Sequence, residues 1–481
     1  MKPFGLNELP PVFVIPTYRL MDAAQTVSYY DQHFHDFGRK IDLWVFDDSP
    51  FTMSQKYYPL LEKTPTFNDV YYVGPDEKTA YIKKTCELAG VSIADSVINR
   101  IFRPSYGGNR NFALIYTLGR IIMSSDDDMK PGGYVLKDRP QLATNVVLRA
   151  TSVKNPEQAA EFVTHDVAGS FLNVLGKHPH EVDLIQGEYA EDRYYDILSN
   201  IRKERAENGS DPECTYLTLK PLTSPLEDTT IKMAQTFMTG TNDIDSIDLF
   251  YAFLHSTKET IESLNETYVI EAFRTFASKI NWRFACGVAG YDNREGLPPF
   301  FPTRLRFEDY IFRLWSQHKS VATAHVKSIQ HHTRSPRMRP TLADDIYNEM
   351  TANFMKDKIR ETLSGITDLA ISFDYDGIVT EAEVKGLLDY GQRLDGMVEK
   401  SLKKEKSNPR LHILQEFRDG LRRNLGNYEF DTFLRKFSQD VDEEMYIIKD
   451  GMTYWERLVQ ITLLRILKDD MPIKKVKNMR K

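Results

Sequence analysis

Three consecutive carboxylates, Asp126, Asp127 and Asp128, are the residues of this chain best suited to chemistry. They follow a short apolar run at residues 121–123 that predicts a strand, and acids gathered at a strand end repel one another. A divalent cation removes that cost, because Mg²⁺ and Mn²⁺ prefer oxygen ligands and often bind one or two carboxylates together with substrate phosphates. The triplet therefore predicts a metal and diphosphate site, and a solvated acidic loop is the alternative.

The elements that must position these acids are predicted upstream of them. Apolar runs at residues 12–15, 41–46 and 70–73 alternate with helix-compatible stretches, which indicates βαβ units and a mostly parallel α/β sheet. In such sheets, ligands bind beyond the carboxyl ends of the strands. Polar residues follow three of these ends: Thr17 and Tyr18, Asp47 and Asp48, and Asp126 to Asp128. We therefore expect them to converge.

A second candidate for chemistry is the acidic pair Glu308 and Asp309, which opens a predicted helix at residues 310–315. Carboxylates at a helix N-terminus are favoured by the helix dipole alone, and this explains one of the two acids. The functional interpretation is a base that takes the proton from an acceptor hydroxyl. We favour the base over the plain cap.

The order of these parts resembles the nucleotide-diphospho-sugar glycosyltransferases of the GT-A fold, most closely family 2, over roughly residues 10–335. Four motifs carry the resemblance: Pro16, Thr17 and Tyr18 after the first strand; Asp47 and Asp48 after the second; Arg110 and Asn111 opening a helix; and the D-x-D motif Asp126 to Asp128. The resemblance implies a Rossmann-like sheet flanked by helices. It also implies transfer of a sugar from a UDP- or GDP-sugar to an acceptor hydroxyl.

The resemblance also implies a role for each residue of the donor pocket. Asp48 would bind the uracil or guanine edge, and Tyr18, next to Pro16 and Thr17, would stack on or line the base. Arg110 would support this pocket. Asp126 and Asp127 are also assigned to the donor side, and Asp128, with help from Asp126, would hold Mn²⁺ or Mg²⁺ on the diphosphate.

On the acceptor side, the resemblance makes Asp309, with Glu308 before it, the base of an inverting enzyme. A His-x-x-Arg pattern at His331 and Arg334 resembles an extra metal ligand. His332 has the same chemistry, but strand alternation sends only one of the two inward, and His331 is our choice. A plain surface histidine pair is the alternative.

Composition narrows the class of protein. The 481 residues carry a net charge of −7, which argues against a general nucleic-acid binder. We find no signal peptide and no apolar run long enough to span a bilayer, and the three cysteines are far apart. We therefore expect a cytoplasmic protein in a reducing compartment, without disulfides or a zinc site.

The predicted domains are a catalytic one at residues 1–340, with an insertion within 132–280 that shapes acceptor recognition, and a helical one at 341–481. An apolar face within residues 453–467 is expected to pack inside the protein, with a homo-oligomer seam as the alternative. The basic end, residues 474–481, is expected to be a disordered tail; contact with an anionic membrane surface is the alternative.

Other functions were weighed against the glycosyltransferase. Asp374 and Asp376 resemble the nucleophile motif of haloacid-dehalogenase phosphatases and loosely fit a calcium loop, but a turn with a helix cap is our interpretation. A sugar-nucleotide pyrophosphorylase would need a glycine-rich phosphate loop with an arginine right after the first strand, and the stretch from Pro16 to Arg19 lacks the glycines. A non-catalytic carbohydrate-binding or scaffold protein that keeps the fold is the alternative outside enzymes.

Overall fold

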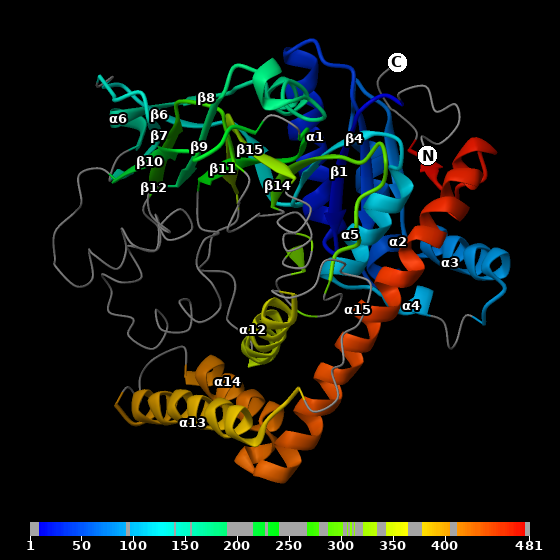
Figure 1. The fold of residues 1–481 in the computed structure, drawn as a ribbon, viewed down its shortest axis with the longest axis vertical. Coiled ribbons are helices and arrows are strands. Elements are labelled where there is room, and N and C mark those ends of the chain that lie inside the picture. Colours follow the sequence, from blue (N-terminus) through cyan, green and yellow to red (C-terminus); the bar gives the residue numbers. More distant parts are fainter. Residues whose placement is uncertain are drawn as a thin grey trace.

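The structure is a computed structural model. It describes residues 9–92, 97–138, 141–153, 156–189, 215–226, 229–239, 267–278, 287–301, 305, 308–309, 312, 321–333, 343–363, 378–404 and 411–476. Within these ranges the protein is α/β, with one large mixed sheet and a C-terminal helical region (Figure 1). None of the described helices is long and apolar enough to cross a membrane.

The first part of the sheet is parallel, as the sequence predicts. Its strands lie in the order β3 (Val70–Val73), β2 (Asp42–Asp47), β1 (Val12–Thr17) and β4 (Ile121–Ser125). The helices that connect them are α1 (Leu20–Asp36), α2 (Phe51–Lys63), α3 (Pro75–Ala89), α4 (Val97–Ile101) and α5 (Tyr106–Tyr116). Because β2 and β4 flank β1 on opposite sides, the order of strands reverses between β1 and β4. In open α/β sheets, ligands bind outside the carboxyl ends of the strands at this kind of switch point.

Helices cover both faces of these strands. Phe13 and Ile15 of β1 are buried against α1, whereas Val12 and Val14 are buried in the core that α3, α4 and α5 share. Side chains alternate between the faces of a strand, so a strand covered on both faces needs a continuous apolar run. This requirement explains why residues 12–15 could be recognised as a strand.

Beyond β4 the sheet is mixed. The next strands in space are β14 (Val288–Asp292), β11 (Ile231–Thr239), β15 (Ala322–His332), β13 (Phe276–Ser278), β9 (Ile185–Tyr189), β10 (Thr215–Pro221), β7 (Val146–Val153) and β12 (Thr267–Ala272). Among these pairings only β11 with β15 and β13 with β9 are parallel. The expectation of a mostly parallel sheet is therefore wrong beyond the first four strands. Antiparallel neighbours need no crossover helix, so this part of the chain lacks the helix signals of βαβ units.

Short elements complete this region. β5 (Met129–Pro131) pairs with the end of β15, and β6 (Gly133–Leu136) pairs with β8 (Ala160–Val163) in a separate two-stranded sheet. The short helices here are α6 (Pro156–Ala159), α7 (Val167–Leu172) and the 3₁₀ turn η1 (Pro179–Glu181). Residues 132–280, predicted to contain an insertion, thus contribute several strands to the large sheet itself.

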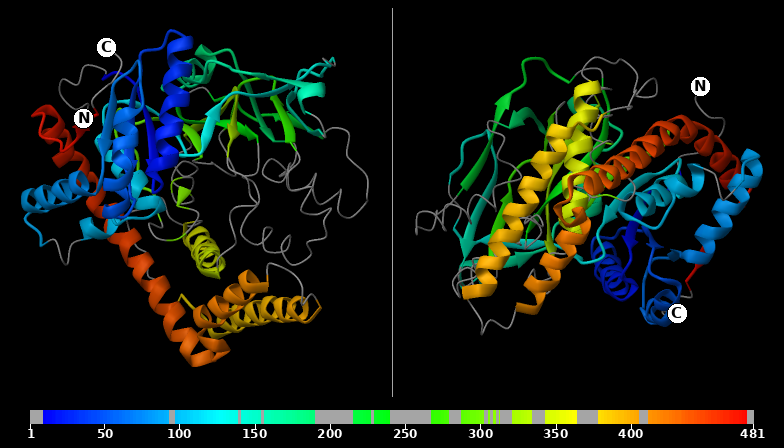
Figure 2. Two further views of the ribbon diagram at one scale, coloured as in Figure 1. Left: turned by 180° about the vertical axis from the view of Figure 1, so that it is seen from behind. Right: turned by 90° about the horizontal axis from the view of Figure 1, so that it is seen from below.

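The C-terminal region is helical, as predicted. It contains α12 (Ala343–Leu363), α13 (Glu381–Lys404), α14 (Leu411–Asn424), the 3₁₀ turn η4 (Gly426–Tyr428) and α15 (Phe430–Leu467). Figure 2 shows α15 running from α13 and α14 to the side of the α/β part, where it packs against α3, α4 and α5. One continuous apolar core joins residues of α12 to α15 with residues of β1, β2 and α5.

The end of the chain is more ordered than the sequence suggests. After α15, β16 (Lys474–Lys475) pairs antiparallel with the edge strand β3. Lys474 lies 2.8 Å from Glu77, and Lys475 lies 2.5 Å from Asp69. The expected disordered tail is therefore wrong for residues 474–476, because the edge of β3 offers backbone partners and nearby acids. Residues 477–481 lie outside the described part.

Buried histidines predict a loss of stability in mild acid. The His325 ring stacks on Phe276 with centroids 4.7 Å apart, and burial lowers the pKa of His325 to about 3. The unfolded chain takes up this proton near pH 6.5 and the folded chain does not until about pH 3. Stability is therefore lost as pH falls below 6.5, by about 1.4 kcal/mol per pH unit for one group.

We expect His325→Phe, which keeps an aromatic ring, to show a flatter dependence of the unfolding free energy on pH between 6.5 and 5. Urea unfolding at several pH values measures it. His412→Phe on α14, at an exposed position, is the matched control and should keep the wild-type slope. The same slope in His325→Phe as in the wild type would show that His325 does not cause the pH dependence.

Candidate functional site

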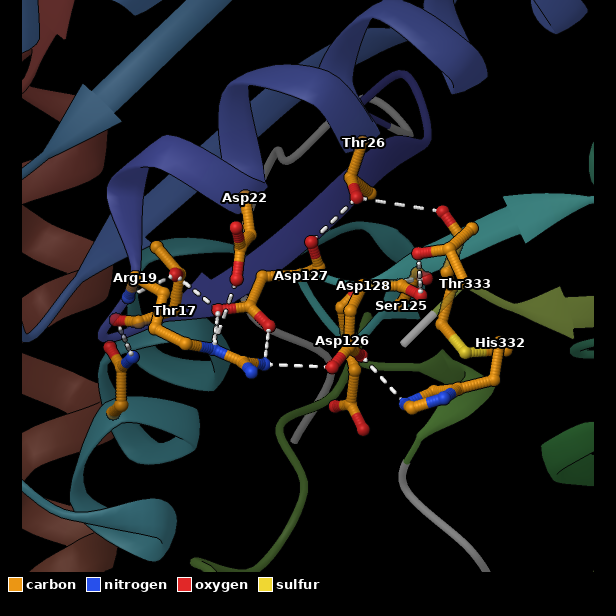
Figure 3. A network of polar contacts seen from close by, with 12 residues as sticks. Thr17, Arg19, Asp22, Thr26, Ser125, Asp126, Asp127, Asp128, His332 and Thr333 are labelled. Carbon is orange, nitrogen blue, oxygen red and sulfur yellow. Dashed lines mark hydrogen bonds and ion pairs between the residues drawn. The ribbon is translucent and has the colours of Figure 1, made fainter. Parts of the chain in front are cut away.

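The predicted acids lie at the switch point between β1 and β4. Thr17 ends β1, and its hydroxyl donates a hydrogen bond to Asp127 Oδ2 at 2.5 Å. The Asp48 backbone N–H donates to the Thr17 carbonyl at 2.7 Å, which brings the end of β2 to the same place. Thr26 of α1 donates to the Asp127 carbonyl at 2.7 Å (Figure 3). Three separate parts of the chain thus converge here, as the strand ends predicted.

Arg19 forms hydrogen bonds with two of the three acids, although it belongs to none of the motifs in the sequence. Its Nε donates to Asp127 Oδ2 at 3.2 Å, its Nη2 donates to the other oxygen of Asp127, and Nη2 also donates to Asp128 Oδ2 at 2.9 Å. Asp127 is buried, and burial raises its pKa to about 6 even with Arg19 beside it. Burial lowers and Asp127 raises the pKa of Arg19, with a net rise. A cation two residues past the first strand was the signal available in the sequence.

His332 is the histidine that contacts the acids. Its Nε2 lies 3.1 Å from Asp128 Oδ1, and the Thr333 backbone N–H donates to the Asp128 carbonyl at 2.9 Å. Burial alone would raise the pKa of Asp128, but the hydrogen bond with His332 and the charge of Arg19 lower it to about 2. Both carboxylate oxygens of Asp128 therefore have partners.

His331, which the sequence analysis prefers over His332 as the metal ligand, lies against Tyr134. Its ring lies edge-on to Tyr134, with centroids 6.1 Å apart, and burial lowers its pKa to about 4. Neighbouring residues of a strand face opposite sides, and the register of β15 with β5 places His332 opposite Met129, next to Asp128. The sequence gives the alternation but not this register.

Arg110 joins the acidic triplet to the second candidate pair. Its Nη2 donates to Asp126 Oδ1 at 3.0 Å, and its Nε donates to Glu308 Oε1, 198 positions away in the chain, at 3.2 Å. The Asp126 side chain is 40% exposed. Its partial burial raises its pKa, although the charge of Arg110 acts to lower it. Asp309 is the next residue after Glu308 in the chain. The helix predicted at residues 310–315 lies mostly outside the described residues.

Gly108, two residues before Arg110, has a steric reason to be glycine. Ser105 caps α5 by accepting a hydrogen bond from the Gly108 backbone N–H at 3.1 Å. A Cβ at Gly108 would collide with the Arg103 backbone carbonyl. The glycine therefore lets the chain turn tightly into the helix that carries Arg110.

Asp48, the predicted base-binding residue, lies in a buried ion pair. Lys78 of α3 donates to Asp48 Oδ1, and the Ser105 backbone N–H donates to Asp48 Oδ2 at 3.0 Å. Lys78 also donates to Asn109 at 2.7 Å. Burial raises the pKa of Asp48 and lowers that of Lys78. Tyr18, predicted to contact the base, is half exposed.

The donor groups of this site are of the kinds that divalent cations bind. Asp126, Asp128 and His332 offer carboxylate oxygens and an imidazole, the ligands that suit Mn²⁺ or Mg²⁺. In the described part of the chain, however, no three such side chains are already grouped for a metal ion. Instead, Asp128 faces Arg19 and His332, and Asp126 faces Arg110. A cation would have to replace some of these contacts.

Comparison with known proteins adds no assignment. No family model matches the chain, and no curated protein matches it. Asp374 and Asp376, the competing phosphatase-like pair, lie outside the described residues.

Proposed function

We propose that this chain is a glycosyltransferase that moves a sugar from a nucleotide-diphosphate donor, a UDP- or GDP-sugar, to an acceptor hydroxyl. The observation that carries the proposal is the bridge from Asp126 through Arg110 to Glu308. It joins the predicted donor side to the predicted acceptor side at a switch point of the sheet, where α/β proteins bind ligands. The sequence resemblance supports the same reaction.

The residues of the site suit the parts of this reaction. Arg19 and Arg110 form ion pairs with the triplet, and guanidinium groups pair well with phosphate oxygens. Asp126 and Asp128 would hold Mn²⁺ or Mg²⁺, which when bound stabilises the charge of the leaving diphosphate as a Lewis acid. Asp309 would take the proton of the acceptor hydroxyl, and Glu308, held by Arg110, keeps it beside the donor.

A single base at Asp309 predicts inversion at the sugar carbon, because the acceptor then attacks opposite the leaving diphosphate. NMR of the product, taken before it equilibrates, gives the anomeric configuration. Retention of the donor's configuration would contradict this assignment.

The binding part of the proposal is tested by thermal unfolding with UDP, GDP or ADP, each with and without Mn²⁺. A ligand that binds only the native state stabilises it by about 2.7 kcal/mol at a hundredfold excess over Kd. We expect one nucleotide to raise the melting temperature only with Mn²⁺, and Asp128→Asn to abolish the rise.

Asp166→Asn is the matched control, since Asp166 also pairs with an arginine, Arg39, but away from the triplet. It should keep the shift of the wild type. No shift with any nucleotide would overturn the donor assignment and favour a non-catalytic protein that keeps the fold.

A further inference from the structure

One edge of the Arg19 guanidinium is unused. Its Nε and Nη2 pair with Asp127 and Asp128, but Nη1 is buried and has no hydrogen-bond partner among the described residues. An unsatisfied buried donor costs free energy, and one on a charged group costs more. The arrangement therefore favours the binding of an anion, which Nη1 could reach once the guanidinium turns.

Arg19 also opposes a metal ion at Asp128. Asp128 Oδ1 pairs with His332 and Asp128 Oδ2 with Arg19, so a cation bound at Oδ2 would lie beside the guanidinium. The two positive charges would repel each other, and Arg19 therefore weakens the binding of a cation to Asp128. Arg19 can give up its contact with Asp128 and still remain in the site, because its Nε and Nη2 also donate hydrogen bonds to the buried Asp127.

We infer that Arg19 couples the metal to the donor diphosphate. In the free protein it competes with the divalent cation for Asp128; when a diphosphate binds, the guanidinium turns to the phosphate oxygens and Asp128 becomes available to the cation. The inference rests on the proposed function and assigns Arg19 as a positioning residue. Binding couplings of this kind are reciprocal and typically change affinity about 5- to 150-fold.

The test uses Mn²⁺ binding, measured by electron paramagnetic resonance of free Mn²⁺ and by calorimetry, with no turnover. The variant is Arg19→Met combined with Asp127→Asn. It removes one positive and one negative charge, so the net charge of the site is unchanged and no buried carboxylate is left at position 127 without Arg19, while Asp128 keeps His332. We expect this variant to bind Mn²⁺ alone at least about 5-fold more tightly than the wild type.

In the wild type, UDP or GDP should tighten Mn²⁺ binding. In the double variant this enhancement should be smaller, by the same factor by which the variant binds Mn²⁺ alone more tightly than the wild type. A diphosphate binds the metal directly and gives some enhancement in any case, so Mn²⁺ alone is the decisive measurement. Arg39→Met with Asp166→Asn is the matched control and should leave both affinities unchanged. Arg19→Lys, which keeps the charge but not the planar fork, should keep the weak binding of Mn²⁺ alone.

Two failures are distinguishable. If nucleotide and Mn²⁺ bind the wild type together but the double variant binds Mn²⁺ alone no more tightly, Arg19 is not the competitor and the inference is wrong, while the proposed function stands. If no nucleotide binds the wild type with or without Mn²⁺, both are overturned.

Discussion

Arg110→Met is expected to lower kcat/KM for sugar transfer by about 10²- to 10³-fold, the usual loss when one preorganised electrostatic group is removed from an active site. Arg110 is the only described residue seen to contact both Asp126 and Glu308, through its Nη2 and Nε. Without it, two carboxylates would face each other across the site with no cation between them. Repulsion would move Glu308, and with it Asp309, away from the donor.

The measurement is donor consumption at several acceptor concentrations, together with a melting curve. Arg110→Lys keeps the charge but has no fork to span both acids, so we expect an intermediate loss. Arg422→Met is the matched control: Arg422 lies on α14 and also pairs with a carboxylate, Asp395, at 2.8 Å. Wild-type turnover in a folded Arg110→Met would remove the bridge from the mechanism.

The sequence predicts well where its own periodicity carries the information. Residues 12–15 and 122–123 are apolar and buried, and the polar residues after these strands meet because parallel strands end at one edge of the sheet. The convergence of Thr17, Asp48 and the acidic triplet follows from this alone. The mixed second half of the sheet could not be predicted in this way. There, β14 lies between β4 and β11, and these strands pair residues that are far apart in the chain.

The side chains that pair with the acids also cannot be predicted from a sequence pattern. Arg19 contacts Asp127 across 108 positions, and Lys78 contacts Asp48 across 30, with no motif to connect them. His332 rather than His331 meets Asp128 because of a register, and a shift of one residue would exchange the two. Residue types thus suggest what chemistry is available, whereas tertiary packing decides which side chains perform it.

The chain cut after residue 340, the predicted domain boundary, is expected not to fold cooperatively. The Trp455 indole N–H donates to the Leu297 carbonyl at 2.6 Å, and the Thr462 and Tyr81 hydroxyls are 2.7 Å apart. Glu444 is fully buried and pairs with Arg103, in the loop before α5. Removing α15 would therefore expose the surface of α3, α4 and α5 against which it packs.

The size of the loss follows from the buried side chains of α15. Ile447, Ile448, Trp455 and Leu458 are each at most 5% exposed and belong to the core shared with β1 and α5. Each large apolar side chain contributes roughly 1.5–3 kcal/mol of burial, and a domain has only about 5–15 kcal/mol of net stability. The apolar surface left behind on the α/β side also becomes exposed to solvent. The loss of burial free energy should therefore exceed the net stability of the remaining chain.

Urea unfolding followed by near-ultraviolet circular dichroism measures this, since it reports fixed aromatic packing. We expect no sigmoidal transition for residues 1–340, and an unchanged one for a chain cut after Val476, which keeps β16 and its pairing with β3. Cooperative unfolding of residues 1–340 would instead show a separable catalytic domain with an appended helical one. The continuous core argues for the first outcome: α15 begins among the C-terminal helices, but its second half packs as a helix of the α/β layer.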